Sequence, residues 1–228
     1  MKAESFLMAM VLAATICFGG CVPHKAAETV RDAKQLEASP KIAEYLRSGH
    51  YVQALHRIGM YWQQKHHVDT ECPEEALIKP GQVVVLQPIV HREGDAYPRS
   101  GAWQQRFEFA RCGQKKTCNA IFLATPSAPP QVQPLPPGDT IASLQLLHDA
   151  RQAAMMAAYL KLGPQEEGKK CRDMEIVDTK LISPPPMGLL PKSGPWVEEW
   201  TIDCCGKPVA VTADFAPNGR GGTSFHFK

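Results

Sequence analysis

The chain has 228 residues, and its 25 Lys and Arg against 23 Asp and Glu give a formal net charge of +2. A charge this close to neutral offers no electrostatic basis for binding nucleic acid, so no nucleic-acid partner is predicted. The eight cysteines make disulfide bonding and metal binding the first possibilities to weigh.

The N-terminus is typical of an export signal. Lys2 precedes an uncharged stretch, residues 5–20, that ends in small residues before Cys21. A membrane-spanning helix needs about 20 apolar residues, and this apolar core is shorter; a buried core helix is the other alternative. We expect residues 1–20 to be a signal peptide and the polar residues 21–39 to form a flexible tether.

The four residues that end the signal, Phe18-Gly19-Gly20-Cys21, resemble the lipobox of bacterial lipoproteins. In that family the cysteine becomes the acylated first residue of the mature chain. The resemblance implies that Cys21 carries a lipid such as palmitate and anchors the protein in the cell envelope. Val22 after the cysteine, in place of Asp, implies the outer membrane, facing the periplasm. Cleavage by the ordinary signal peptidase, with Cys21 left as a thiol, is the alternative.

Residues 40–125 read as a first α+β repeat. Apolar side chains recur at helical spacing over residues 40–65, and Ser48-Gly49 divides the pattern into two helices. Residues 82–90 are rich in β-branched side chains, which favours a strand. Trp103 and Phe107 then alternate with polar residues, as in an antiparallel strand with one buried face, and Gly113 permits a tight turn into a strand at 120–125.

Residues 126–138 separate this repeat from the next. Six prolines lie between Thr125 and Asp139, and they remove backbone donors and favour extended chain. We expect a stiff linker here, with an ordinary long loop as the alternative.

Residues 139–228 read as a second α+β repeat. Asp139 is a plausible N-cap for a helix that Gly163-Pro164 ends. Extended runs follow at 174–182, 196–202, 209–215 and 223–227, with an Asn218-Gly219 hairpin before the last.

The strongest internal signal is a repeated motif: SGAWQQRFEFARCG at 100–113 returns as SGPWVEEWTIDCCG at 193–206, identical at five of fourteen positions. A fixed spacing indicates a repeated structural unit. The predicted fold is therefore α+β, two tandem repeats, each a helix on a small antiparallel sheet. The residues that define the motif are Trp103, Phe107, Gly113, Trp196, Glu198, Trp200 and Gly206.

The second copy, Gly-x-Trp-x-Glu-x-Trp followed by Cys-Gly and the ending at 219–227, resembles motifs in exported bacterial proteins that remain uncharacterised. The resemblance implies a fold and no activity. In the first copy Gln105 replaces Glu198, and Phe107 replaces Trp200.

Six cysteines remain after Cys17 and Cys21 are set aside, and an even number in an exported chain indicates disulfides. Sequence alone leaves fifteen pairings, but each repeat has one cysteine before its tryptophan motif and one at the end of it. Cys204 and Cys205 are neighbours on a strand, so they point to opposite faces and need different partners. The predicted pairs are Cys72–Cys112, Cys171–Cys205 and Cys118–Cys204.

No metal site or cofactor is predicted. There is no CxxC pair, and no His lies at ligand spacing from the cysteines. His66 and His67, near Asp69 and Glu71, would point about 100° apart on a helix end.

No catalytic residue is predicted either. His91, Asp95 and Ser100 could be considered as a catalytic set, but no nucleophile-elbow sequence surrounds the serine. Glu198 and Glu199 face opposite sides of one strand, which prevents joint acid–base chemistry. We expect Glu198 to bond a neighbouring backbone group or arginine, and the aromatic stripes to be core rather than a sugar-stacking surface.

These observations favour a non-enzymatic envelope lipoprotein that binds another envelope or secreted protein. The alternative is an enzyme acting on cell-wall or polysaccharide substrate in a cleft between the repeats, with Glu198 near Arg106 or His91. An exported immunity or inhibitor protein would differ only in its partner.

Overall fold

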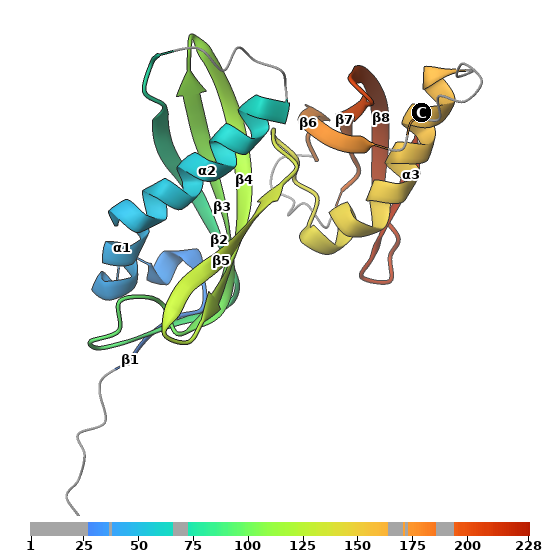
Figure 1. Ribbon diagram of the computed structural model, residues 1–228. Coiled ribbons are helices and arrows are strands. Elements are labelled where there is room, and N and C mark those ends of the chain that lie inside the picture. The colour runs from blue at the N-terminus through green and yellow to red at the C-terminus, as the bar shows by residue number, and fades with distance from the viewer. Residues whose placement is uncertain (1–26, 37, 66–72, 164–170, 172, 186–193) are drawn as a thin grey trace, which may run out of the picture.

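The computed structural model describes residues 27–36, 38–65, 73–163, 171, 173–185 and 194–228. The signal peptide, Cys21 and residues 22–26 and 37 of the predicted tether lie outside these residues. The fold is α+β, as predicted, with two antiparallel sheets that lie side by side (Figure 1).

The first sheet has five strands in the order β1-β2-β3-β4-β5. Its helices α1 and α2 lie across one face. Helix α2 runs along this face from the end of the sheet near β1 toward β6 of the other sheet (Figure 1). The elements are β1 (Ala27–Val30), a short 3-10 helix (Ala33–Gln35), α1 (Pro40–Leu46), α2 (Gly49–Lys65), β2 (Leu77–Arg92), β3 (Ser100–Arg111), β4 (Gln114–Thr125) and β5 (Ala128–Leu135).

Helix α2 packs on this sheet through a helically spaced apolar stripe that includes Tyr51, Leu55, Ile58 and Trp62. Gly59 lies in the middle of the stripe, and a Cβ there would stand 2.0 Å from the ring of Phe109. The missing side chain therefore allows the helix to sit directly on β3. The predicted division of the helical region at Ser48-Gly49 is confirmed.

Two segments of the first half differ from the prediction. The Pro-rich residues predicted as a linker form β5, which pairs with β4 from Asn119↔Leu135 to Thr125↔Ala128. Proline is tolerated because β5 is an edge strand, whose outer side needs no ladder donors. The predicted tether also contributes a strand, since β1 pairs with the end of β2.

The second sheet has four strands in the order β6-β7-β8-β9. Helix α3 presents a stripe of fully buried small residues, Ala150, Ala154 and Ala158, which lets it pack closely on the sheet. The elements are α3 (Leu144–Leu162), β6 (Met174–Ser183), β7 (Trp196–Cys204), β8 (Lys207–Pro217) and β9 (Thr223–Phe227).

The N-cap of α3 is Ser143, whose hydroxyl accepts from the Leu146 N–H, and not Asp139 as predicted. Before Ser143, the N–H groups of Asp139 and Ile141 donate to the Thr179 carbonyl and the Glu198 carboxylate of the second sheet. The predicted end at Gly163 is confirmed.

The two sheets are not the equal helix-on-small-sheet repeats that the sequence predicts, because the first has five strands and two helices and the second has four strands and one helix. The alternation expected for the tryptophan strands is confirmed. Trp103, Phe107, Trp196 and Trp200 are all buried.

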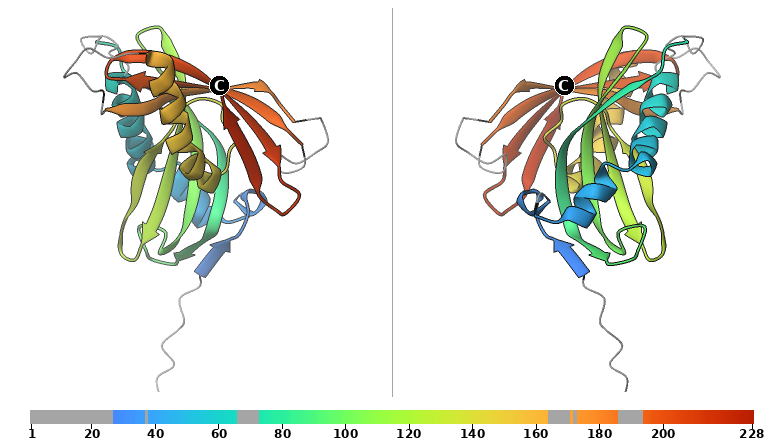
Figure 2. Two further views of the ribbon diagram at one scale, coloured as in Figure 1. Left: turned by 90° about the vertical axis from the view of Figure 1, so that its right-hand side faces the viewer. Right: turned by 90° about the vertical axis from the view of Figure 1, so that its left-hand side faces the viewer.

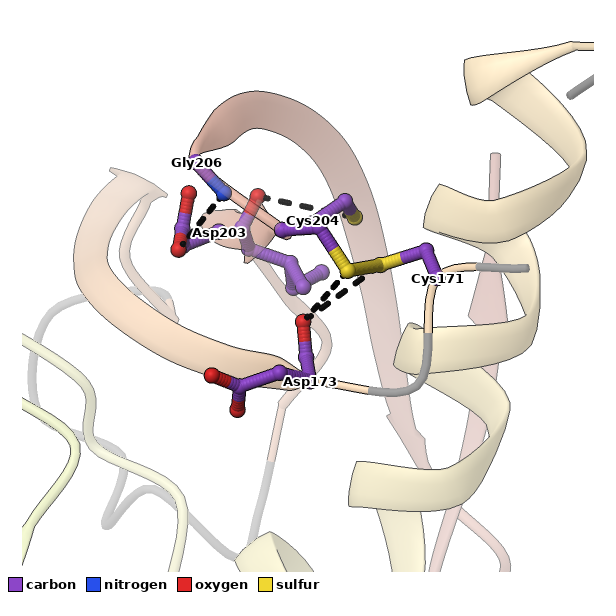
Figure 3. The surroundings of a disulfide bond; sticks show 7 residues. Cys171, Asp173, Asp203, Cys204 and Gly206 are labelled. Atoms are coloured by element: carbon purple, nitrogen blue, oxygen red, sulfur yellow. Dashed lines mark hydrogen bonds between the residues drawn. A yellow bond between two sulfur atoms is a disulfide. The ribbon is translucent and has the colours of Figure 1, made fainter. Parts of the chain in front are cut away.

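The predicted Cys171–Cys205 disulfide is present, with the Cα atoms 5.7 Å apart (Figure 3). Cys205 and Gly206 both have positive φ and form the two-residue turn between β7 and β8, as a type I′ hairpin requires. The Cys205 N–H donates to the Asp173 carbonyl at 3.0 Å, which also ties the turn to the start of β6.

The predicted Cys118–Cys204 bond is wrong, because both cysteines are free and buried. Cys118 belongs to the core under α2, and Cys204 to the core under α3. Each side chain fills a different hydrophobic core and cannot reach the other. Cys112 is also disulfide-bonded; Cys72, its predicted partner, lies outside the described residues.

Replacing both Cys171 and Cys205 by serine should lower the free energy of unfolding by about 3 kcal/mol, because the bond closes a loop of 34 residues. Denaturant unfolding measures the loss. Cys204→Ala, which leaves the bond intact, is the control for changing a cysteine at this place. Equal unfolding midpoints for the wild type and the double variant would contradict the prediction.

Candidate functional site

The two halves meet at residues 136–141, which we call the junction segment. On one side the Gly138 N–H donates to the Thr117 carbonyl of β4 at 2.8 Å. On the other side the Asp139 N–H donates to the Thr179 carbonyl of β6 at 2.7 Å. The backbone between the sheets is therefore hydrogen-bonded to both of them.

Gly138 is required at this crossing. Its φ is +97°, and a Cβ would stand 2.0 Å from the Thr179 carbonyl oxygen. Any other residue would combine a disfavoured backbone conformation with a collision against backbone that cannot move aside.

Side chains strengthen the same junction. Asn119 of β4 donates to the carbonyls of Pro136 and Gly138 at 2.9 and 3.1 Å. Arg106 of β3 donates to the Thr140 carbonyl at 2.8 Å and to the Asn119 side chain at 3.3 Å. The Thr179 hydroxyl of β6 accepts from the Thr140 N–H at 3.2 Å, so side chains of both sheets bond the junction segment.

A bulge in β6 adds apolar contact between the halves. The register with β7 shifts between Ile176 and Asp178, so Val177 is the extra residue of the bulge. Ile176 is buried in the core under α3, while Val177 is buried in the core under α2. Lys116 of β4 donates to the Val177 carbonyl at 2.8 Å.

Glu198 explains the Trp-x-Glu-x-Trp motif. Its carboxylate is fully buried and accepts from the indoles of Trp196 and Trp200 at 3.0 and 2.7 Å. It also accepts from the Ile141 N–H at the end of the junction segment, at 3.0 Å. The prediction that Glu198 bonds a backbone group is confirmed, but the backbone lies 57 residues away in the chain, and no local pattern could have identified it.

Gln105 occupies the corresponding position of the first copy and has a different network. The Trp103 indole donates to the Tyr51 hydroxyl of α2, which donates to the Gln105 amide oxygen, both at 3.0 Å. The Gln105 amide N–H donates to the Gly81 carbonyl of β2 at 3.1 Å. An amide suits this place because it must both accept and donate, whereas Glu198 only accepts.

A cleft of about 700 Å³ lies where the C-terminal half of α2, the β3–β4 hairpin, the junction segment and the second sheet meet. It carries four cationic side chains against two acidic ones. It is lined by Gly59, Trp62, Gln63, Phe109, Arg111, Gln114, Lys115, Lys116, Thr117, Gly138, Asp139, Asp178, Thr179, Lys180 and Thr201.

Two buried donors on the α2 wall of the cleft have no acceptor among the described residues. They are Nε1 of Trp62, a residue 2% exposed, and Nε2 of Gln63, a residue 7% exposed. The other end of the Gln63 amide accepts from Arg111 at 3.1 Å, which fixes its orientation. A buried donor without a partner lowers the stability of the fold by about 1 to 3 kcal/mol. An acceptor supplied by a ligand would recover part of that free energy.

Two titratable groups in and near the cleft have shifted pKa values. Burial lowers the pKa of Lys116, which lines the cleft, to about 8, and the nearby Asp178 offsets part of that shift. On α2, next to Trp62 of the lining, burial and the hydrogen bond to Glu175 raise the pKa of Tyr61 to about 12. Lys65 also pairs with Glu175, at 3.0 Å, so the end of α2 is tied to β6 by charge.

The structure does not assemble the other sequence candidates into a site. His91 is buried in β2, where its Nδ1 finds no acceptor among the described residues, and Asp95 instead faces Arg99. Arg106 serves the junction, and no contact joins it to Glu198 in the described part of the chain. His66, His67, Asp69 and Glu71 lie outside the described residues.

Within the described ranges, no group of three or more His, Cys, Asp or Glu side chains is placed to hold a metal ion. No described helix combines the length and the apolar character needed to cross a membrane. No family model, curated protein or solved structure matches this chain.

Glu198→Gln should destabilise the fold by about 2 to 3 kcal/mol, because one amide oxygen cannot serve three donors and the new N–H2 group faces other donors. The free energy of unfolding in denaturant measures this. Glu199→Gln is the matched control: its side chain lies on the other face of β7 and should change stability by no more than about 0.5 kcal/mol. Equal effects of the two changes would refute the structural role of Glu198.

Lys116 should make stability depend on pH. Its folded pKa of about 8 lies below the ordinary value of 10.5, so the unfolded chain binds more protons between these values and stability rises with pH across that window. The stability of the wild type minus that of Lys116→Met should increase by about 1 to 2 kcal/mol from pH 7.5 to 10. Subtraction removes the opposite contribution of Cys118, whose pKa burial raises to about 12. A flat difference would contradict the assignment.

Proposed function

We propose that this chain is a non-enzymatic envelope lipoprotein, anchored by a lipid on Cys21, that binds another envelope or secreted protein at the cleft between its two sheets. The observation that carries the proposal is the cleft itself. Both halves line it, and hydrogen bonds through the junction segment hold those halves in one arrangement.

The placement of the described N-terminus supports an anchored binding protein. Strand β1 lies at one end of the first half, and the C-terminal end of α2 and the β3–β4 hairpin lie at the other (Figures 1 and 2). A chain tethered before β1, on the outer membrane and facing the periplasm, would present the cleft away from the bilayer.

The hydrogen bonds made by the polar side chains at the junction support binding over catalysis. Arg106, Asn119, Thr179 and Glu198 all bond backbone groups across the junction or along it. These are structural roles, since each side chain is committed to fixing one half against the other. A preorganised surface of this kind reduces the entropy lost when a partner binds.

We also propose that the strands β2–β4 and β6–β8 are two versions of one unit, each preceded by its helix. The Trp strand is the middle strand of each trio, and both trios turn at a Cys-Gly pair. In this proposal β1, α1 and β5 are additions to the first version.

The enzyme alternative keeps one favourable observation, because ionisable side chains from both halves, such as Lys116 and Asp178, line the cleft. It ranks second because Glu198, its expected acid, is fully buried beneath two indoles. Release of soluble fragments from purified cell wall by the full chain would favour it.

Affinity capture from detergent-solubilised membranes tests the proposal. The wild type should recover a stoichiometric protein partner from the membrane fraction, and Cys21→Ser should move the chain to the soluble fraction and lose incorporation of labelled palmitate. Lys180→Glu, at the cleft, should reduce capture, while Lys207→Glu, an exposed residue on β8 outside it, should not. A preparation without any stoichiometric partner would refute the binding role.

A further inference from the structure

We infer that the cleft binds a carboxylate-bearing peptide, an acidic segment of the partner protein. This deepens the proposed function and rests on it for the identity of the ligand as part of a protein. The site itself stands on three observations of the cleft: its charge, its unpaired donors and its size.

The cleft concentrates positive charge. Its lining carries Arg111, Lys115, Lys116 and Lys180 against Asp139 and Asp178, an excess of two cations that equals the net charge of the entire 228-residue chain; Lys115 also pairs with Glu108 at 2.9 Å. A concave surface lined by one dominant sign concentrates the opposite charge. Lys180 is exposed on β6, where its register partner on β7 is Glu199, and its ammonium group is accessible to an incoming ligand.

The unpaired donors point to the same chemistry by an independent route. The Trp62 indole and the Gln63 amide each hold a buried N–H with no acceptor in the described ranges. Both groups only donate there, so what they lack is an acceptor atom. Ionised carboxylate oxygens accept without donating, and their hydrogen bonds are stronger than those of neutral groups.

The size of the cleft favours a peptide over a free ion. A volume of about 700 Å³ falls in the range that holds a ligand of many atoms, and one inorganic anion would fill little of it. Cations on β4 and on β6 stand on different walls, which suits several carboxylates along one segment better than a single one.

The test measures anisotropy of a fluorescent hexaglutamate peptide with the purified full chain in detergent, in about 50 mM salt. The wild type should bind hexaglutamate in preference to hexalysine. Lys180→Glu should weaken binding about fivefold, with a smaller effect in about 500 mM salt because screening shortens the range of the charge. Lys207→Glu makes the same charge change outside the cleft and should leave the affinity unchanged.

Gln63→Glu tests the donor argument. The new carboxylate keeps an oxygen for Arg111 but replaces the unpaired N–H2 with an acceptor, so hexaglutamate affinity should fall at least about tenfold, with the unfolding midpoint retained. Because Lys180 is exposed, Lys180→Glu keeps the inference testable even if the Gln63 variant fails to fold.

Several outcomes would overturn the inference. Equal losses from Lys180→Glu and Lys207→Glu would mean that only diffuse surface charge is measured. Equal affinity for hexalysine would remove the charge preference. Displacement of hexaglutamate by inorganic phosphate at equal anion concentration would assign the site to a small free anion. Partner capture that Lys180→Glu does not affect would retain a protein-binding role but place the partner on another surface, against both this inference and the proposed binding site.

Failure of the proposed function has a separate signature. If capture recovers no partner while hexaglutamate binding depends on Lys180 and Gln63, the anion site stands and the protein-binding role falls.

Discussion

The structure depends on a backbone contact between Gly138 and Thr179, made at a distance that excludes any side chain at position 138. Because the same glycine is hydrogen-bonded to Thr117 of the first sheet, and Asp139 beside it to Thr179, this crossing fixes the position of β6 relative to β4. The bulge at Val177 then places one residue of the second sheet in the core of the first. Two sheets that a flexible connection would leave independent are thus held as one body, and a cleft between them has a defined shape.

Burial of a full carboxylate is the second constraint on the arrangement. Taking Glu198 out of water costs several kcal/mol, and the two indoles and the Ile141 N–H must offset that cost. Such a group contributes less to stability than to specificity, because only one placement of the junction segment satisfies it. The first sheet has no buried carboxylate at the corresponding position. Its Gln105 is bonded to Tyr51 and to β2, so the two similar strands serve different purposes.

The sequence predicts the features that depend on local patterns and misses those that depend on contacts between residues far apart in the chain. The alternation of Trp103 and Trp196 with polar neighbours predicts both tryptophan strands, and Gly163 marks the end of α3, because these are local patterns. The prediction of a linker at the residues of β5 is wrong, since composition does not distinguish a free Pro-rich segment from an edge strand. The bond predicted between Cys118 and Cys204 failed because counting cysteines says nothing about two separate cores. The cleft is formed by segments far apart in the chain, so no local sequence motif predicts it.

The placement of helix α2 accounts for the unpaired donors of the cleft. Helix α2 is pinned to β3 by the contact of Gly59 with Phe109 and to β6 by the bonds of Tyr61 and Lys65 to Glu175. With both of its contacts set by packing, the helix cannot rotate to bring Trp62 or Gln63 to an acceptor. The lack of acceptors for these two N–H groups is therefore a consequence of how the helix is packed in the fold. Groups held in this way lose little further freedom when an acceptor arrives, and the desolvation of their N–H groups has already occurred on folding. The contacts that hold α2 against β3 and β6 therefore also prepare the cleft to bind an acidic segment.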